Sequence, residues 1–167
     1  MVTDESLYQL AERVGQTLRD RKLMLTSAES CTGGGVGEAI TRVPDSSHWF
    51  ERGFITYTYI SKREMLGVSG DTLGRHGAVS EPTVREMVAG ALERSHAQVA
   101  VAVSGTAGPG GGTPEKPVGT VCFAWGIKGG AVVSETQHFA GDRQSVRQQS
   151  VVHALEGVLL LLARLTP

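Results

Sequence analysis

The sequence predicts an α/β fold: one domain over residues 1–167, built as a three-layer α/β/α sandwich on a mixed sheet. Helical and strand-like patterns alternate along the chain, as in domains whose sheet is covered by helices on both faces. A glycine turn between two strand patterns predicts an antiparallel hairpin, which makes the sheet mixed. With 167 residues and no internal repeat or linker, the chain is long enough to bury one core without disulfides or metals.

Helical periodicity is clearest in three segments. The first covers 4–22, the second begins after the N-cap residue Ser80, and the last begins near Asp142. A shorter helical segment covers 36–43. The apolar stripes of the three long helices are predicted to face the core. They comprise Leu7, Leu10, Ala11, Val14 and Leu18, then Val84, Met87, Val88 and Leu92, and finally Val146, Val151, Leu155, Val158, Leu159 and Leu162.

Runs rich in β-branched or aromatic residues predict strands at 22–28, 54–59, 98–104, 118–126 and 131–139. The last two runs flank a Gly-Gly turn and form the predicted hairpin. Within the run at 98–104, residues 99–103 are all apolar, so this strand is predicted to be covered on both faces.

The composition excludes several classes of partner. A formal net charge of −1 provides no global basic field, so we expect neither nucleic acid nor an anionic membrane as a partner. The first residues lack the pattern of a signal peptide, and the longest apolar run, 158–163, is too short to span a bilayer. Cys31 and Cys122 show neither disulfide nor metal-site spacing. We therefore expect a cytoplasmic protein that uses no metal and no cofactor.

A glycine-rich turn follows the first predicted strand, with Ser30 at its head and Gly33 and Gly34 behind it. Backbone N–H groups at such a turn can hold a phosphate or stabilise the oxyanion of an intermediate formed on Ser30. The motif is neither a Walker A loop nor a G-x-S-x-G elbow. The alternative is that Ser30 or Thr32 simply caps the following helix.

A reactive serine needs a base. The five histidines show no evident pairing with an aspartate, and each is more simply a surface or core residue. Lys62, at the end of the strand predicted at 54–59, is the better candidate because desolvation lowers the pKa of a lysine. Tyr57 could relay or position the proton. The alternatives are that Lys62 is a solvated surface charge and that Cys31, intrinsically the stronger nucleophile, is an inert buried thiol.

A second glycine-rich loop, 104–113, directly follows the apolar strand at 98–104. Loops beyond the carboxyl ends of strands line the ligand crevice of open α/β sheets, and glycines let the backbone approach a ligand. A purely structural loop is the alternative. Arg143 and Arg147 then lie one helical turn apart, where they could bind a phosphate or pair with an acidic side chain.

Taken in order, these motifs resemble the CinA C-terminal domain family, and within it the stand-alone nicotinamide mononucleotide deamidases. The resemblance covers nearly the whole chain. It depends on A-E-S-C-T-G-G at 28–34, Y-T-Y-I-S-K at 57–62, M-L-G-V at 65–68, G-A-V-S at 77–80, S-G-T-A-G-P-G-G-G-T-P-E-K-P-V-G-T-V at 104–121 and G-D-R at 141–143. Two stretches depart from the family's usual pattern: Thr106 stands in place of isoleucine, and Tyr57-Thr58-Tyr59 in place of tyrosine-serine-asparagine.

The resemblance implies hydrolysis of the carboxamide of nicotinamide mononucleotide, a small-molecule substrate, with release of ammonia in pyridine-nucleotide salvage. It implies Ser30 as the nucleophile and Lys62 and Tyr57 as its activating partners. The implied substrate site comprises Cys31, Thr32, Gly33, Gly34, Ser104, Gly105, Thr106, Gly108, Gly111, Gly112 and Arg143. A homo-oligomer is expected of a compact α/β enzyme with an apolar C-terminal helix. The rival hypotheses are a non-catalytic nucleotide-binding or regulatory domain, and a hydrolase of another amide.

Overall fold

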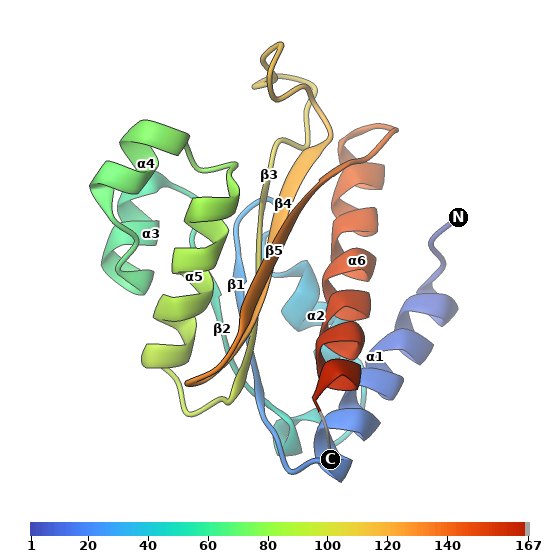
Figure 1. The fold of residues 1–167 in the computed structure, drawn as a ribbon. Helices are drawn as coiled ribbons and strands as arrows, with labels where there is room; N and C mark the ends of the chain where they lie inside the picture. Colours follow the sequence, from blue (N-terminus) through green and yellow to red (C-terminus); the bar gives the residue numbers. More distant parts are fainter. Residues whose placement is uncertain (166–167) are drawn as a thin grey trace.

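A five-stranded mixed sheet forms the centre of the molecule in the computed structural model, which describes residues 1–165 (Figure 1). The strand order is β2-β1-β3-β4-β5, in which the first three strands are parallel and the last two antiparallel. The strands are β1 (Leu25–Glu29), β2 (Phe50–Ile55), β3 (Val99–Gly105), β4 (Thr120–Ile127) and β5 (Val132–His138). The predicted mixed sheet and its C-terminal hairpin are confirmed.

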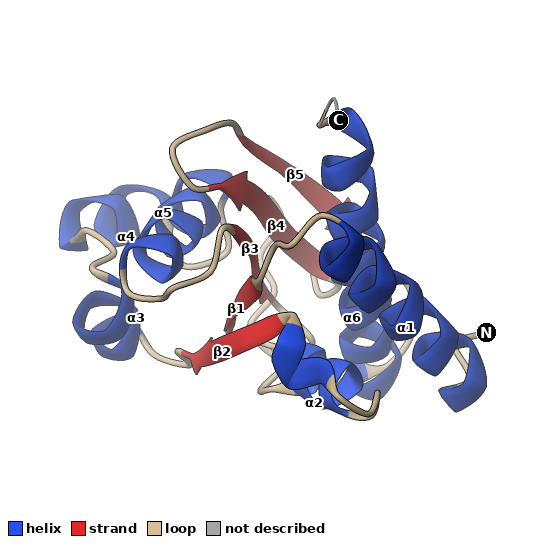
Figure 2. Cartoon of the chain, turned by 90° about the horizontal axis from the view of Figure 1, so that it is seen from below, coloured by secondary structure: helices blue, strands red, loops and turns tan. Residues whose placement is uncertain are grey.

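Helices cover both faces of this sheet, as Figure 2 shows in a view from below. One layer contains α1 (Asp4–Asp20), α2 (Gly35–Thr41) and α6 (Arg143–Arg164), and a short 3₁₀ turn, Ser46–His48, precedes β2. The other layer contains α3 (Tyr59–Leu66), α4 (Gly70–His76) and α5 (Glu81–Glu93). The α/β/α sandwich predicted from the sequence is therefore confirmed.

Side-chain caps fix the starts of the long helices. Ser80 accepts a hydrogen bond from the Thr83 N–H, as its N-cap position predicts, and Asp142 accepts one from the Ser145 N–H. Thr3 forms a capping box at the start of α1. Each cap satisfies N–H groups that lack partners inside the helix, so the predicted starts at Ser80 and Asp142 are confirmed.

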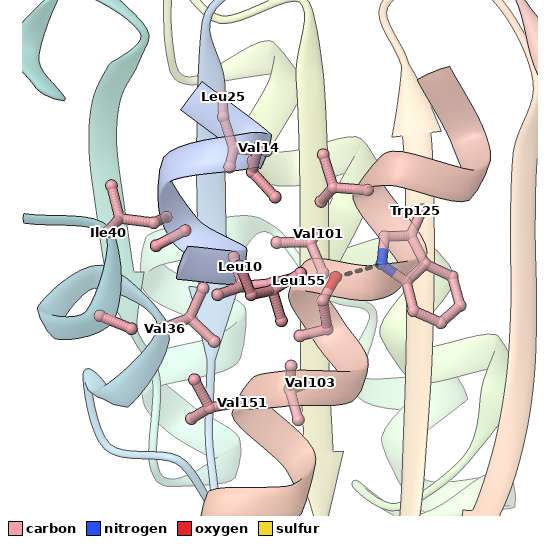
Figure 3. Packing of buried hydrophobic residues seen from close by; sticks show 14 of the residues in the cluster. Leu10, Val14, Leu25, Val36, Ile40, Val101, Val103, Trp125, Val151 and Leu155 are labelled. Atoms are coloured by element: carbon pink, nitrogen blue, oxygen red, sulfur yellow. Dashed lines mark hydrogen bonds between the residues drawn. The ribbon is translucent and has the colours of Figure 1, made fainter. Parts of the chain in front are cut away.

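Strand β3 divides the hydrophobic core into two clusters. Val99, Val101 and Val103 belong to the cluster under α1, α2 and α6 (Figure 3), whereas Ala100 and Ala102 belong to the cluster under α5. Alternate residues of a strand point to opposite faces, so both faces of β3 are buried, as predicted. On the first side, the Trp125 indole N–H donates to the carbonyl oxygen of Ala154 in α6 at 2.9 Å (Figure 3).

The strand predicted at 54–59 overlaps the observed strand only at residues 54 and 55, because β2 covers Phe50–Ile55. Strand β2 ends at Ile55, and helix α3 begins at Tyr59. The reason is a capping box in which Thr58 and Ser61 each bond the backbone N–H of the other, which outweighs the β-propensity of Tyr57 and Tyr59. Lys62 therefore lies in the first turns of a helix instead of at a strand end. The strand predicted at 22–28 begins only at Leu25, and helix α4 was not predicted.

Helix α3 rests closely on α5 because Gly90 has no side chain. A Cβ atom at Gly90 would collide with the carbonyl oxygen of Leu66, the last residue of α3. The close approach places α3 beside the carboxyl ends of β1 and β2. This packing positions Lys62 for the site described next.

Candidate active site

The carboxyl ends of the three parallel strands bring the sequence motifs together. Glu29, the last residue of β1, is paired with Ile55 of β2 and with Val103 of β3. The chain therefore leaves the sheet at neighbouring points: at Ser30, at Thr56 and just beyond Ser104. The strand order also places β2 and β3 on opposite sides of β1, which is the arrangement at which open α/β sheets bind ligands.

The turn after β1 is shaped by backbone hydrogen bonds and two glycines. The Ser30 N–H donates to the Val103 carbonyl at 2.9 Å, and the Gly33 N–H donates to the Ser30 carbonyl at 3.0 Å. Gly33 and Gly34 have φ angles of 57° and 102°. Side chains rarely tolerate this left-handed region, so glycine is needed at both positions to turn the chain from β1 into α2.

Helix α2 is not capped by Ser30 or Thr32. Its N-cap residue, Gly34, provides no side chain, and the carboxylate of Glu29 accepts the N–H groups of Val36 and Gly37 at 2.9 and 3.1 Å. Thr32 donates its hydroxyl to the same carboxylate at 2.6 Å. The capping alternative is therefore wrong. Glu29 was missed in the sequence, although an acidic residue shortly before a helix is a usable signal for a cap.

Ser30 instead contacts Lys62. The Lys62 Nζ donates to the Ser30 hydroxyl at 3.0 Å and to the Thr56 carbonyl at 2.7 Å. Lys62 is only 1% exposed, which excludes the alternative of a solvated surface charge. Burial disfavours the ammonium form and lowers the pKa of Lys62 from 10.5 to about 8. A neutral amine is thus accessible near neutral pH beside a serine hydroxyl.

Cys31 lies next to Ser30 and is a free, buried thiol. It is 5% exposed, and burial raises the pKa of its thiol from 9.0 to about 12. Because the thiolate is the reactive form, the Cys31 thiol is a poor nucleophile at neutral pH. This favours Ser30 as the reactive atom of the turn.

Replacing Cys31 with alanine is accordingly expected to change kcat/KM by no more than about threefold, because a protonated thiol takes no part in the chemistry. The free energy of unfolding should fall by about 1 kcal/mol through the small cavity left behind. Steady-state kinetics and thermal unfolding of the same preparation test both parts. A hundredfold loss of kcat with an unchanged melting temperature would contradict the assignment of Cys31 as inert.

Around this pair lies a pocket of about 170 Å³. Seven of its lining residues are among those implied by the sequence: Ser30, Cys31, Tyr57, Lys62, Ser104, Gly105 and Arg143. Four more were not assigned to the site from the sequence: Tyr59, Ala78, Val79 and Ala107. The pocket thus joins all three sequence motifs around one serine hydroxyl.

Comparison with known proteins shows the family of this chain. The model of the CinA C-terminal domain matches residues 7–162. The chain belongs to the CinA C-terminal domain family. It is 52% identical over 155 residues to the nicotinamide-nucleotide amidohydrolase PncC of Escherichia coli K12, covering 93% of this chain and 94% of that protein. It is 55% identical over 157 residues to the PncC of Pseudomonas putida, covering 94% and 98%.

Solved structures of this family share the fold. The crystal structure of the competence/damage inducible protein CihA from Agrobacterium tumefaciens matches with a TM-score of 0.92 and 43% sequence identity, covering 98% of both chains. A competence damage-inducible protein A from Klebsiella pneumoniae matches with a TM-score of 0.92 and 39% identity, covering 96% of this chain and 99% of that one. The fold of this CinA domain is therefore that of its family.

In this CinA domain, Tyr57 and Arg143 form the mouth of the pocket. Arg143 donates to the Tyr57 hydroxyl at 3.0 Å and to the Gly108 carbonyl at 2.8 Å, so it bridges two sides of the mouth. Tyr57 is 59% exposed, and Lys62 reaches Ser30 without it. Within residues 1–165, Arg143 and Arg147 form no ion pair, so the predicted alternative of an acidic partner is wrong for both.

The remaining residues implied by the resemblance lie outside the pocket lining: Thr32, Gly33, Gly34, Thr106, Gly108, Gly111 and Gly112. Thr106 exchanges backbone hydrogen bonds with residues 119 and 120, which closes the base of the loop. Gly112 lies against Val118 so closely that it leaves no room for a Cβ atom. These residues shape the two loops, and those loops in turn bring Ser104, Gly105 and Ala107 to the site.

Two further properties concern the whole described chain. None of the helices within residues 1–165 combines the length and apolar character needed to cross a membrane. The same residues contain no group of three or more His, Cys, Asp or Glu side chains that could hold a metal ion.

Proposed function

We propose that this CinA domain is an amidohydrolase that converts nicotinamide mononucleotide to nicotinic acid mononucleotide and ammonia, as a step of NAD salvage. The observation that carries the proposal is the 3.0 Å contact between the buried amine of Lys62 and the hydroxyl of Ser30. A pure nucleotide-binding domain needs neither a buried lysine nor its contact with a serine. The names of the PncC relatives, which match over nearly the full length of both chains, support the choice of substrate.

The first half of the reaction acylates Ser30. Neutral Lys62 takes the hydroxyl proton as Ser30 Oγ attacks the carboxamide carbon, and a C–O bond forms. The carboxamide oxygen becomes an oxyanion. The Lys62 ammonium then gives its proton to the amide nitrogen, the C–N bond breaks, and ammonia leaves.

The second half releases the acid. Lys62, neutral again, takes a proton from a water molecule that attacks the ester carbon. The ester C–O bond breaks, Ser30 recovers a proton from Lys62, and the carboxylate product leaves. The Thr56 carbonyl holds the amine in place through both halves, because its 2.7 Å hydrogen bond does not depend on substrate.

The size of the pocket indicates how the substrate lies. A volume of about 170 Å³ is below the roughly 300–1,000 Å³ of sites that enclose drug-sized ligands. The pocket therefore suits the carboxamide-bearing ring, and the ribose phosphate would extend past Tyr57 and Arg143 at the mouth. A homo-oligomer and a cytoplasmic location remain predictions from the sequence.

Incubation of the purified protein with nicotinamide mononucleotide tests the proposal. We expect equal amounts of ammonia and nicotinic acid mononucleotide, measured by a coupled ammonia assay and by chromatography. Because the proposed steps use no metal, a chelator should leave the rate unchanged. Binding of the nucleotide without ammonia release would favour the regulatory domain, and release from other carboxamides but not from this one would change the substrate.

A further inference from the structure

Arg147 is an exposed residue of α6 that donates hydrogen bonds to the turn after Ser30. Its Nε donates to the carbonyl of Cys31 at 3.1 Å, and its Nη2 donates to the carbonyl of Thr32 at 3.3 Å. The guanidinium also lies against Gly33, where an added Cβ atom would be 3.4 Å from Nη2. Two neighbouring carbonyls thus share one rigid donor fork, a geometry that a lysine could not reproduce.

These hydrogen bonds from Arg147 fix the direction of the Thr32 N–H group. The peptide bond between Cys31 and Thr32 is planar and trans, so the Thr32 N–H points opposite to the Cys31 carbonyl that Arg147 holds. Among residues 1–165, the Thr32 N–H has no hydrogen-bond acceptor. Arg147 and Thr32 line a different cavity from the catalytic pocket, which is lined by Ser30 and Cys31. The turn therefore separates Arg147 from the reacting serine.

The turn is held from a second point by Glu29. This carboxylate is 2% exposed and accepts the Thr32 hydroxyl and the first N–H groups of α2. Glu29 fixes the side chain of Thr32. Arg147 donates to the Cys31 and Thr32 carbonyls, and the Thr32 carbonyl also accepts the Gly35 N–H at 2.9 Å. With both held, the Thr32 peptide has little freedom to rotate.

We propose that Arg147 is a positioning residue that, with Glu29, holds the Cys31–Thr32 peptide so that its N–H donates to the oxyanion formed on Ser30. The inference rests on the proposed serine chemistry and deepens it. A donor that is fixed before the reaction stabilises developing charge without reorganising, and removing one such donor lowers kcat by about 10²–10³-fold. Arg147 acts through the peptide and does not touch the substrate.

The experiment compares Arg147→Ala and Arg147→Lys with the unaltered protein, using nicotinamide mononucleotide and its phosphate-free riboside. Arg42→Ala is the matched control, because Arg42 lines the same cavity as Arg147 but bonds Glu38 and Asp4 instead of the turn. We expect kcat to fall about 100-fold in Arg147→Ala and somewhat less in Arg147→Lys, with KM within about threefold of its original value. Arg42→Ala should keep its full rate.

Two further measurements separate positioning from other roles. Loss of kcat/KM should be equal for the nucleotide and the riboside, and guanidinium ions in the millimolar range should restore part of the rate to Arg147→Ala only. A raised KM for the nucleotide alone, with kcat unchanged, would make Arg147 a phosphate ligand and overturn the inference. So would full activity of Arg147→Ala. Failure of the proposed function itself is distinct: the unaltered protein would then release no ammonia, or Ser30→Ala would be as active as the original.

Discussion

Replacing Ser30 with alanine is expected to lower kcat for ammonia release by at least about 10³-fold while leaving the fold intact. The substitution removes the atom that attacks the carboxamide carbon in the proposed mechanism. Lys62 keeps its hydrogen bond to the Thr56 carbonyl, so its amine is not left without a partner. The free energy of unfolding should therefore change by about 1 kcal/mol or less. Single-turnover kinetics and thermal unfolding measure the two effects separately.

Ser46→Ala provides a matched control for this variant. Ser46 and Ser30 are both 8% exposed, but Ser46 lies in the 3₁₀ turn before β2, outside the pocket. Its replacement should leave kcat unchanged. If Ser30→Ala turned over within tenfold of the original protein, Ser30 would not be the nucleophile, and an attack by water on the amide would replace the acyl intermediate.

Replacing Lys62 with methionine is expected to abolish activity and to stabilise the protein. Methionine fills the volume of the lysine stem but has no amine to accept the serine proton. A buried ammonium is unfavourable, so its removal should raise the free energy of unfolding by about 1 kcal/mol or more at pH 7 and the melting temperature by a few degrees. Lys128→Met is the control, because Lys128 also donates to a carbonyl, that of Ser95, outside the pocket.

The lowered pKa of Lys62 predicts how both the stability gain of Lys62→Met and the activity of the unaltered protein depend on pH. In the unfolded chain the amine titrates near 10.5, and in the folded protein near 8. Below pH 8 the amine is protonated in both the folded and the unfolded state. The folded state then carries the full free-energy cost of burying the Lys62 ammonium. The penalty shrinks between pH 8 and 10.5 as the folded state releases its proton first. The stability gain of Lys62→Met should therefore be largest below pH 8 and disappear above 10.5.

The pH dependence of activity should show the titration of the same Lys62 amine. Only the neutral amine can act as the base, so kcat/KM should rise about tenfold per pH unit below about pH 8 and level off above it. Stopped assays across pH 6–10 with constant ionic strength measure the profile. A flat profile between pH 6 and 9, or a lysine variant that keeps its rate, would exclude Lys62 as the base.

The layers and the sheet could be predicted because their signals are local. The stripe from Leu7 to Leu18, the apolar run 99–103 of β3 and the Gly-Gly hairpin each contain a complete pattern within one segment. The segment 54–59 could not be predicted in this way. Its composition favours a strand, and only the reciprocal bonds of Thr58 and Ser61 show that a helix begins there.

The sequence predicts which residues form the site better than it predicts how they are arranged. The rule that parallel strands end at one edge indicates that the loops after β1, β2 and β3 meet. It does not give the contact between Lys62 and Ser30, which depends on how closely α3 packs against Gly90 of α5. Arg147 bonds two backbone carbonyls of the turn, and a sequence carries little trace of such contacts. The assignment of Gly111 and Gly112 to the substrate site stays a prediction.

The contact between Ser30 and Lys62 also joins the two outer layers of the molecule. Ser30 belongs to a turn anchored by α2 and α6, and Lys62 is carried by α3, which rests on α5 across the sheet. A sliding of one layer against the other by about an ångström would separate the pair without breaking a helix or a strand. In the proposed mechanism, activity therefore depends on the relative position of the two helical layers. It is sensitive to strain that leaves the secondary structure unchanged.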